Sequence, residues 1–153
     1  MSGAARVGRR RVFARHFKRA TDGLEPGYAT YLSFSPRGNL LIRYRDEPNL
    51  TRLDGYASES IPGPPVTGNL PQAFRIYESV TGQLWTLDPE GVQWRDGEVW
   101  QKAVVPEIRD DMRMEARRLA RPIPLLPAEH GRLFVLLSDR LLKFDALTRQ
   151  TYV

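Results

Sequence analysis

Three segments of this chain align on a glycine, and this repeat constrains the fold more than any other feature of the sequence. They span residues 32–43, 76–87 and 125–136, and their shared glycines are Gly38, Gly82 and Gly131. In each segment an apolar stretch precedes a turn, and Gly-X-Leu with a further large apolar residue follows it. The glycines are 44 and 49 residues apart. This spacing is close to the period of propeller blades, roughly 40–50 residues.

Signals for further strands follow each glycine-led stretch. Residues 88–91 (Asp-Pro-Glu-Gly) are typical of a turn, because Pro presets φ and Gly accepts positive φ. Residues 92–95 then alternate apolar and polar, as a half-buried strand does. Asp96 and Gly97 form a second tight turn, and Asp54 with Gly55 ends the hairpin of the first repeat in the same way. Each repeat therefore reads as a four-stranded antiparallel unit.

Two segments separate the repeats. The region from Ile61 to Pro71 holds four prolines and two glycines, so we interpret residues 63–71 as a linker. In the second segment, 106–122, apolar residues recur at helical spacing between Pro106 and Pro122. These residues are Ile108, Met112, Ala116 and Leu119. The spacing predicts a short amphipathic helix near 107–120, inserted between the second and third repeats.

The composition excludes several functional classes. None of the 153 residues is cysteine, which excludes disulfides, thiol catalysis and Cys-ligated zinc. Only two residues are histidine, His16 and His130, which excludes a histidine-rich metal site. No cofactor is expected. Residues 1–19 hold seven basic residues and no acid, whereas the other 134 hold 16 basic and 18 acidic. The positive charge therefore belongs to a tail that we expect to be disordered. Nucleic acid, which needs a basic folded face, is not an expected partner, and neither is a membrane.

No set of residues has the pattern of a catalytic site. Asp110 and Asp111 are neighbours that point in different directions on a helix, and His130 lacks an identifiable orienting partner. The best binding candidate is the run Arg43, Tyr44 and Arg45 at the end of a predicted strand. Arginine forks match carboxylates, so this run could receive a small anionic ligand such as a sugar acid. The alternative is a solvated strand end, paired with acidic neighbours.

The repeats resemble those of the two-component regulator propeller family. The matching residues are Asp22, Gly23, Leu24, Gly38, Gly82, Trp85, Gly91, Asp96, Gly97 and Gly131, within residues 20–153. Leu41 and Phe134 replace the tryptophan of the second repeat. The resemblance implies a structural, blade-packing role for Trp85. It also implies a non-catalytic sensory segment of a bacterial signalling protein, periplasmic with a downstream output module; the alternative location is cytoplasmic.

We therefore predict an all-β partial propeller of about three blades, with repeats at 20–62, 72–105 and 123–153. A blade cannot bury both of its faces alone. The open ends are expected to expose Phe34, Leu40, Ile42, Leu133, Val135 and Leu137. These faces would pack on further blades of the same chain or on copies of it, and an isolated monomer is expected to behave poorly. Two functions follow: a ligand-binding sensory segment, or an interaction scaffold that completes a propeller. A propeller lyase or hydrolase has the least support.

Overall fold

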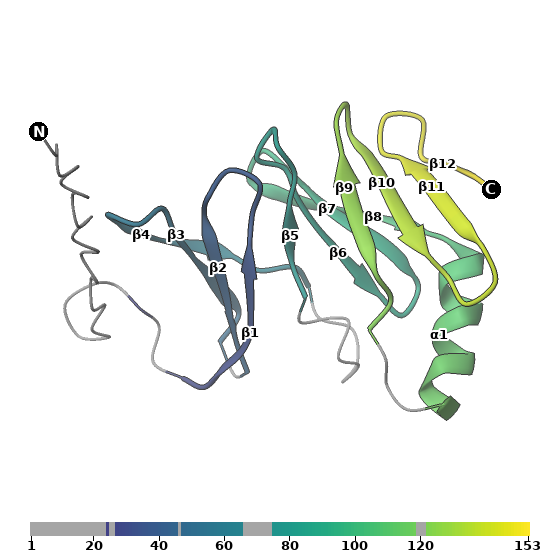
Figure 1. The fold of residues 1–153 in the computed structure, drawn as a ribbon, viewed down its shortest axis with the longest axis horizontal. Helices are drawn as coiled ribbons and strands as arrows, with labels where there is room; N and C mark the ends of the chain where they lie inside the picture. The colour runs from purple at the N-terminus through teal and green to yellow at the C-terminus, as the bar shows by residue number, and fades with distance from the viewer. Residues whose placement is uncertain (1–23, 25–26, 46, 66–74, 119–121) are drawn as a thin grey trace, which may run out of the picture.

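The computed structural model describes residues 24, 27–45, 47–65, 75–118 and 122–153, and it confirms the expected fold class (Figure 1). These residues form three four-stranded antiparallel sheets and one helix. The sheets stand in an open array in chain order, without closing a ring. None of the described helical segments is long and apolar enough to cross a membrane.

Each sheet is a simple meander in which neighbouring strands follow one another along the chain. The first sheet contains β1 (Ala29–Phe34), β2 (Leu40–Tyr44), β3 (Asn49–Leu53) and β4 (Ser58–Pro62). The second contains β5 (Tyr77–Glu78), β6 (Leu84–Asp88), β7 (Gly91–Asp96) and β8 (Val99–Val104). The third contains β9 (Leu125–Ala128), β10 (Arg132–Leu136), β11 (Leu141–Asp145) and β12 (Gln150–Tyr152). Helix α1 (Pro106–Arg118) connects the second sheet to the third.

The glycine on which the repeats align has the same position in all three sheets. Gly38, Gly82 and Gly131 stand in the turn between the first and second strand, with φ of 80°, 89° and 69°. This is the left-handed region, which glycine enters at little cost. In the first two sheets the same hydrogen bond closes this turn. The N–H of Gly38 donates to the carbonyl of Ser35, and that of Gly82 donates to the carbonyl of Ser79, each at 3.0 Å. The sequence repeat is thus a repeat of one turn.

Strand register gives each sheet two distinct faces. The residue three positions after the shared glycine (Leu41, Trp85 or Phe134) lies on what we call the forward face. The residue two positions after it (Leu40, Leu84 or Leu133) lies on the opposite, backward face. Leu84 packs against the forward face of the first sheet, and Leu133 packs against that of the second. Sheets therefore stack forward face to backward face.

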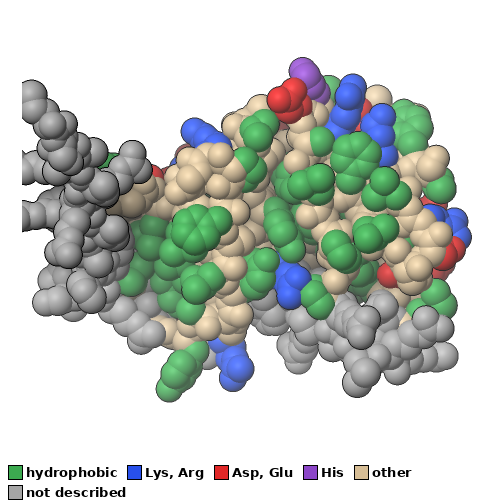
Figure 2. All heavy atoms as spheres, in the orientation of Figure 1, with side chains coloured by type: hydrophobic (Ala, Val, Ile, Leu, Met, Phe, Trp, Pro, Cys, Tyr) green, Lys and Arg blue, Asp and Glu red, His purple; other side chains and the backbone are tan. Residues whose placement is uncertain are grey.

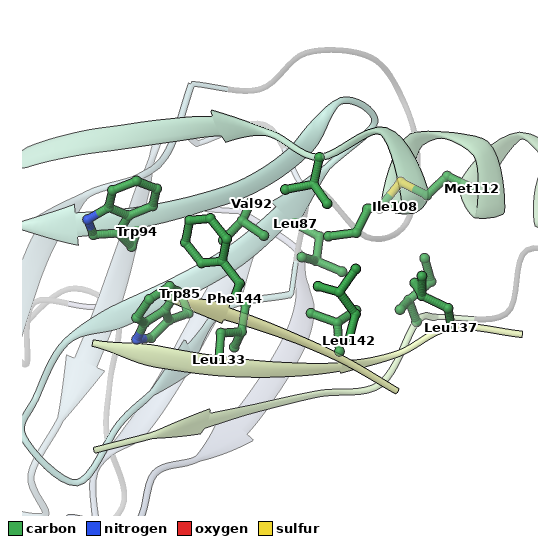
Figure 3. Close-up of a cluster of buried hydrophobic side chains, with 13 residues drawn as sticks. Trp85, Leu87, Val92, Trp94, Ile108, Met112, Leu133, Leu137, Leu142 and Phe144 are labelled. Carbon is green, nitrogen blue, oxygen red and sulfur yellow. The ribbon is translucent and has the colours of Figure 1, made fainter. Parts of the chain in front are cut away.

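Two cores of unequal size fill the interfaces. Between the first and second sheets lie Leu41, Leu50, Ile61, Ile76 and Leu84. A larger core joins the second and third sheets around Trp85, Trp94 and Phe144, and Figure 3 shows these rings lying together. Ile108 and Met112 of α1 extend this larger core, as the predicted helical stripe requires. The helix thus packs over one end of the second interface (Figure 3).

The expectation for the open ends is only partly confirmed. Phe34 is 80% exposed, but Ile42 is buried in a cluster with Tyr44 and Leu53. Leu40 packs against that cluster and is half-buried. The prediction of exposure is wrong for Leu133, Val135 and Leu137, since all three are buried against the second sheet. The reason is register: these residues lie on the backward face, and the open side of the third sheet is its forward face.

Some predicted features lie outside the described residues. These are the basic tail 1–19, Asp22, Gly23, residues 66–71 of the proposed linker, and Leu119 with the predicted end of the helix at 119–120. Leu24 is described and packs against the cluster of Ile42, Tyr44 and Leu53. Strand β4 ends at Pro62, directly before the predicted linker at 63–71, of which the structure describes residues 63–65.

Candidate functional site

The structure does not bring Arg43, Tyr44 and Arg45 together into one site. Arg43 is buried on the forward face of the first sheet, whereas Tyr44 is buried on the backward face and Arg45 is exposed. Consecutive strand residues point to opposite faces, so the run cannot converge on one ligand.

The Arg43 guanidinium is engaged with the backbone. Its Nη1 donates to the carbonyl of Pro48 at 2.8 Å and to that of Asn49 at 3.2 Å. Burial lowers the pKa of Arg43 below its usual value. Gly63 lies against the same group: a Cβ there would stand 2.5 Å from Nη1 and 2.2 Å from the Pro48 oxygen. In this structure Arg43 fastens the loop between β2 and β3.

A charged cluster joins the first and second sheets at their common edge. The Glu78 carboxylate, whose side chain is fully buried, accepts hydrogen bonds from Asn39 Nδ2 at 2.9 Å and Arg52 Nη1 at 3.2 Å. Arg37 Nη1 stands 3.7 Å from Glu78 Oε1, and Arg52 also forms an ion pair with Glu59. Burial lowers the pKa of Arg52, but the hydrogen bonds and charges of Glu59 and Glu78 outweigh it and raise that pKa. The cluster lines a hollow of about 350 Å³, yet its cations already have acidic partners.

A larger hollow of about 650 Å³ lies at the edge between the second and third sheets, and we call it the rim pocket. It gathers side chains from the β5–β6, β9–β10 and β11–β12 turns and from strands β7 and β8. Its lining residues are Gln83, Trp94, Asp96, Gln101, His130, Gly131, Ala146, Leu147 and Arg149. The pocket exists because strand pairing brings these three turns to one edge of the array (Figure 1).

Arg149 stands beside the aromatic wall of this pocket. Its guanidinium carbon is 5.8 Å from the centre of the Trp94 ring, and its Nη2 donates to Gln101 Oε1 at 3.4 Å. Trp94 is itself held by Trp85 and Phe144, with ring centres 6.0 and 5.5 Å away. No ion pair among the described residues involves Arg149 or Asp96.

Backbone conformation fixes the direction of two pocket residues. His130 and Arg149 have φ of 60° and 55°. Residues other than glycine adopt this left-handed conformation at a cost of about 1–2 kcal/mol. Both stand at hairpin turns that project over the pocket. The His130 imidazole is exposed, and its nearest acid is its exposed neighbour Glu129 at 4.0 Å.

The arrangement suits binding through hydrogen bonds and charge. It offers one guanidinium, one carboxylate, two amides and an imidazole beside an indole. Within the described residues, no three His, Cys, Asp or Glu side chains gather as a metal site would need. Sequence reasoning missed Gln83, Gln101 and Arg149. The alignment on the shared glycine could have placed Gln83 next to the β9–β10 turn, since equivalent turns meet at one edge.

Compared with known proteins, the chain matches no protein-family model, and no curated protein matches its sequence. The resemblance to two-component regulator propeller repeats therefore stays a hypothesis carried by the residues quoted above. The fold class rests on the structure.

Proposed function

We propose that this chain is a non-catalytic, ligand-binding segment of a propeller-type protein, and that the rim pocket takes a small anionic sugar. The single observation that carries the proposal is the position of the Arg149 guanidinium, which lies beside the Trp94 ring and hydrogen-bonds Gln101, and has no ion-pair partner among the described residues of the pocket. The pocket, and not the run from Arg43 to Arg45, is the part of the chain that this proposal assigns to the ligand.

The chemistry of a sugar acid fits each part of the lining. Its carboxylate suits the fork of Arg149. Its hydroxyl groups can donate to Asp96 and exchange hydrogen bonds with Gln83 and Gln101, because amides both donate and accept. The volume of about 650 Å³ lies within the range of small-molecule sites, about 300–1,000 Å³.

A binding role is favoured over catalysis by the state of the acid–base groups. A general base must be held in a fixed orientation near its target. His130 faces solvent beside an exposed Glu129, and the pocket's carboxylate, Asp96, has no described ion-pair partner that would hold it. As the resemblance implies, ligand occupancy would then be passed to a neighbouring module.

Calorimetric titration tests this proposal with two matched sugars. We expect D-galacturonate to bind and D-galactose to bind at least about tenfold more weakly, because only the first offers a carboxylate to Arg149. Arg149→Gln should remove the difference between the two sugars.

The control for this titration is Arg140→Gln. Arg140 lies at the opposite end of β10 and pairs with Asp139 through exposed side chains. This variant should bind D-galacturonate as the unaltered chain does. Equal binding of both sugars, no binding of either, or an equal loss in both variants would each refute the proposed site.

A second function, an interaction scaffold, is favoured by one specific observation. The forward face of the third sheet is apolar and open, although the forward faces of the other two sheets are covered. Docking of a partner on this face would not depend on a ligand in the rim pocket.

A further inference from the structure

An apolar surface without a partner covers the end of the array. On the forward face of the third sheet, Leu126, Leu136 and Leu141 are 66%, 52% and 54% exposed. They surround a hollow of about 390 Å³ whose lining also includes Pro124, Leu125 and Phe134 and is almost wholly apolar. Figure 2 shows hydrophobic side chains gathered over β9–β11. An exposed apolar surface of this kind marks an interaction site.

Register indicates what kind of surface should cover it. Phe134 is the equivalent of Leu41 in the first sheet and of Trp85 in the second. Leu41 and Trp85 are both buried against the backward face of the following sheet. The forward face of the third sheet therefore has the form of a surface that receives the backward face of another sheet.

The backward face of the first sheet is open only along β1, because its centre, with Ile42, Tyr44 and Leu53, is a buried cluster on which Leu24 packs. The backward faces of the second and third sheets are packed, through Leu84 and Leu133. On the first sheet Leu32 and Phe34 of β1 are 56% and 80% exposed. The open forward face of the third sheet and the exposed strand β1 are at opposite ends of the array, so they do not meet within the described residues of one copy (Figure 1).

We propose that a second copy of this chain docks head-to-tail, with the forward face of its third sheet on β1 of the first sheet. The contact would place first strands side by side, as β5 and β9 already are within the chain. Two copies would supply six sheets, within the range of about 4–8 blades found in closed propellers. A head-to-tail contact that closes after two copies uses the open forward face and the exposed β1 of each copy.

The mass of the 153-residue chain in solution tests the proposal. Sedimentation at micromolar concentration should give twice the chain mass of 17.5 kDa. The variants Phe34→Glu and Leu136→Glu should each give the mass of one chain. Both contacts of the closed dimer join a third sheet to a β1, so either substitution places a charge in both contacts. Val99→Glu, at a similarly exposed residue of β8, should leave the double mass unchanged. Circular dichroism and thermal unfolding verify that each variant is folded.

Mixing the two variants distinguishes a head-to-tail contact from a symmetric one. The Phe34→Glu chain keeps an intact forward face, and the Leu136→Glu chain keeps an intact backward face, so the mixture regains one unaltered contact. We expect the double mass to return in the mixture and in neither variant alone.

Three outcomes would overturn the proposal. The first is a folded, unaltered chain that stays at the single mass up to 100-fold higher concentration. The second is a Phe34→Glu variant that keeps the double mass, which would indicate contact between two third sheets. The third is a series of masses that grows with concentration, which would exclude closure after two copies.

Discussion

Asp88 shows how a single buried carboxylate is accommodated at the end of a strand. Its Oδ2 accepts hydrogen bonds from Lys102 Nζ and Gln93 Nε2, both at 2.7 Å. Its Oδ1 accepts the backbone N–H groups of Glu90 and Gly91 at 2.7 and 2.9 Å. Burial alone would raise the pKa of Asp88, but the hydrogen bonds of Lys102, Gln93 and Glu90 outweigh it and hold the pKa below 3.8.

This lowered pKa predicts a pH-dependent stability. A carboxyl whose pKa is lower when folded contributes stability above its unfolded pKa, near 3.8, and loses it as the pH falls through the folded value. The free energy of unfolding in urea should therefore fall from pH 5 to pH 2. Asp88→Asn should reduce stability at pH 7 by about 1–3 kcal/mol and flatten this fall.

The matched control for the carboxylate is Asp110→Asn, at an exposed position of α1. It should leave both the stability and its dependence on pH close to those of the unaltered chain. If Asp88→Asn and Asp110→Asn gave the same pH profile, Asp88 would not be the group responsible.

Turns and the helix set the geometry at the scale of elements. Glycine stands at both ends of β7, for different reasons: Gly91 is its first residue and Gly97 follows its last. At Gly91 an added Cβ would lie 2.3 Å from the carbonyl oxygen of Ala103 and 2.6 Å from the nitrogen of Val105. At Gly97, φ is 59° and the space around the Cβ position is open. The first glycine permits close approach of backbones, and the second permits a left-handed turn.

Paired alanine substitutions separate these two reasons. Gly97→Ala should cost about 1 kcal/mol of unfolding free energy, the price of a left-handed alanine. Gly91→Ala should cost more than about 2 kcal/mol, because backbone of β8 must move to make room. Chemical denaturation of both variants measures the difference, and equal losses would show that contact at Gly91 is relieved without strain.

Helix α1 is fastened to the third sheet by a polar contact as well as by its apolar side. The buried Asp111 carboxylate accepts hydrogen bonds from the Ser138 backbone N–H at 3.0 Å and from the Ser138 hydroxyl. Ser138 lies in the turn between β10 and β11. Asp110, its neighbour, is exposed, so the two adjacent carboxylates lie in different surroundings, as neighbouring helix positions predict.

Removal of this contact should weaken the docking of the helix. Asp111→Ala should lower the unfolding free energy by about 1–3 kcal/mol, because it leaves the Ser138 donors unsatisfied. Asp110→Ala should change it by less than about 0.5 kcal/mol. Thermal and urea unfolding of the two variants provide the comparison; a larger loss from Asp110→Ala would contradict the assignment.

The whole molecule combines two interfaces of different strength. The core between the second and third sheets contains three large rings and is extended by α1, whereas five aliphatic residues form most of the core between the first and second sheets. The burial of apolar area is the dominant stabilising term in folding. Stability should therefore be distributed unevenly along the array, as in other repeat architectures.

Native-state hydrogen exchange should reveal this uneven distribution. We expect amides of β6, β7, β10 and β11 to exchange only through global unfolding, and those of β2 and β3 to exchange faster by separation of the first sheet. Measurement by mass spectrometry at several denaturant concentrations distinguishes the two groups. Uniform protection of the three sheets would show that the smaller core is as strong as the larger one.

The sequence by itself determined the local structure of this protein. Turns at Gly38, Gly82 and Gly131, the turn residues Asp96 and Gly97, and the start of the helix at Pro106 follow from backbone preferences that depend on few neighbouring residues. The repetition of these signals was enough to predict the number of sheets and their meander order.

Only the tertiary structure decided which face of each sheet is covered. Residues 133–137 of β10 and the following turn are all apolar, so alternation cannot distinguish the buried Leu133 from the open Leu136. Likewise, the sequence could not show that Arg43 is engaged with backbone carbonyls or that Arg149 reaches the Trp94 ring. The physical reason is that burial depends on the packing of one sheet on the next, and this brings together residues that are far apart in the chain.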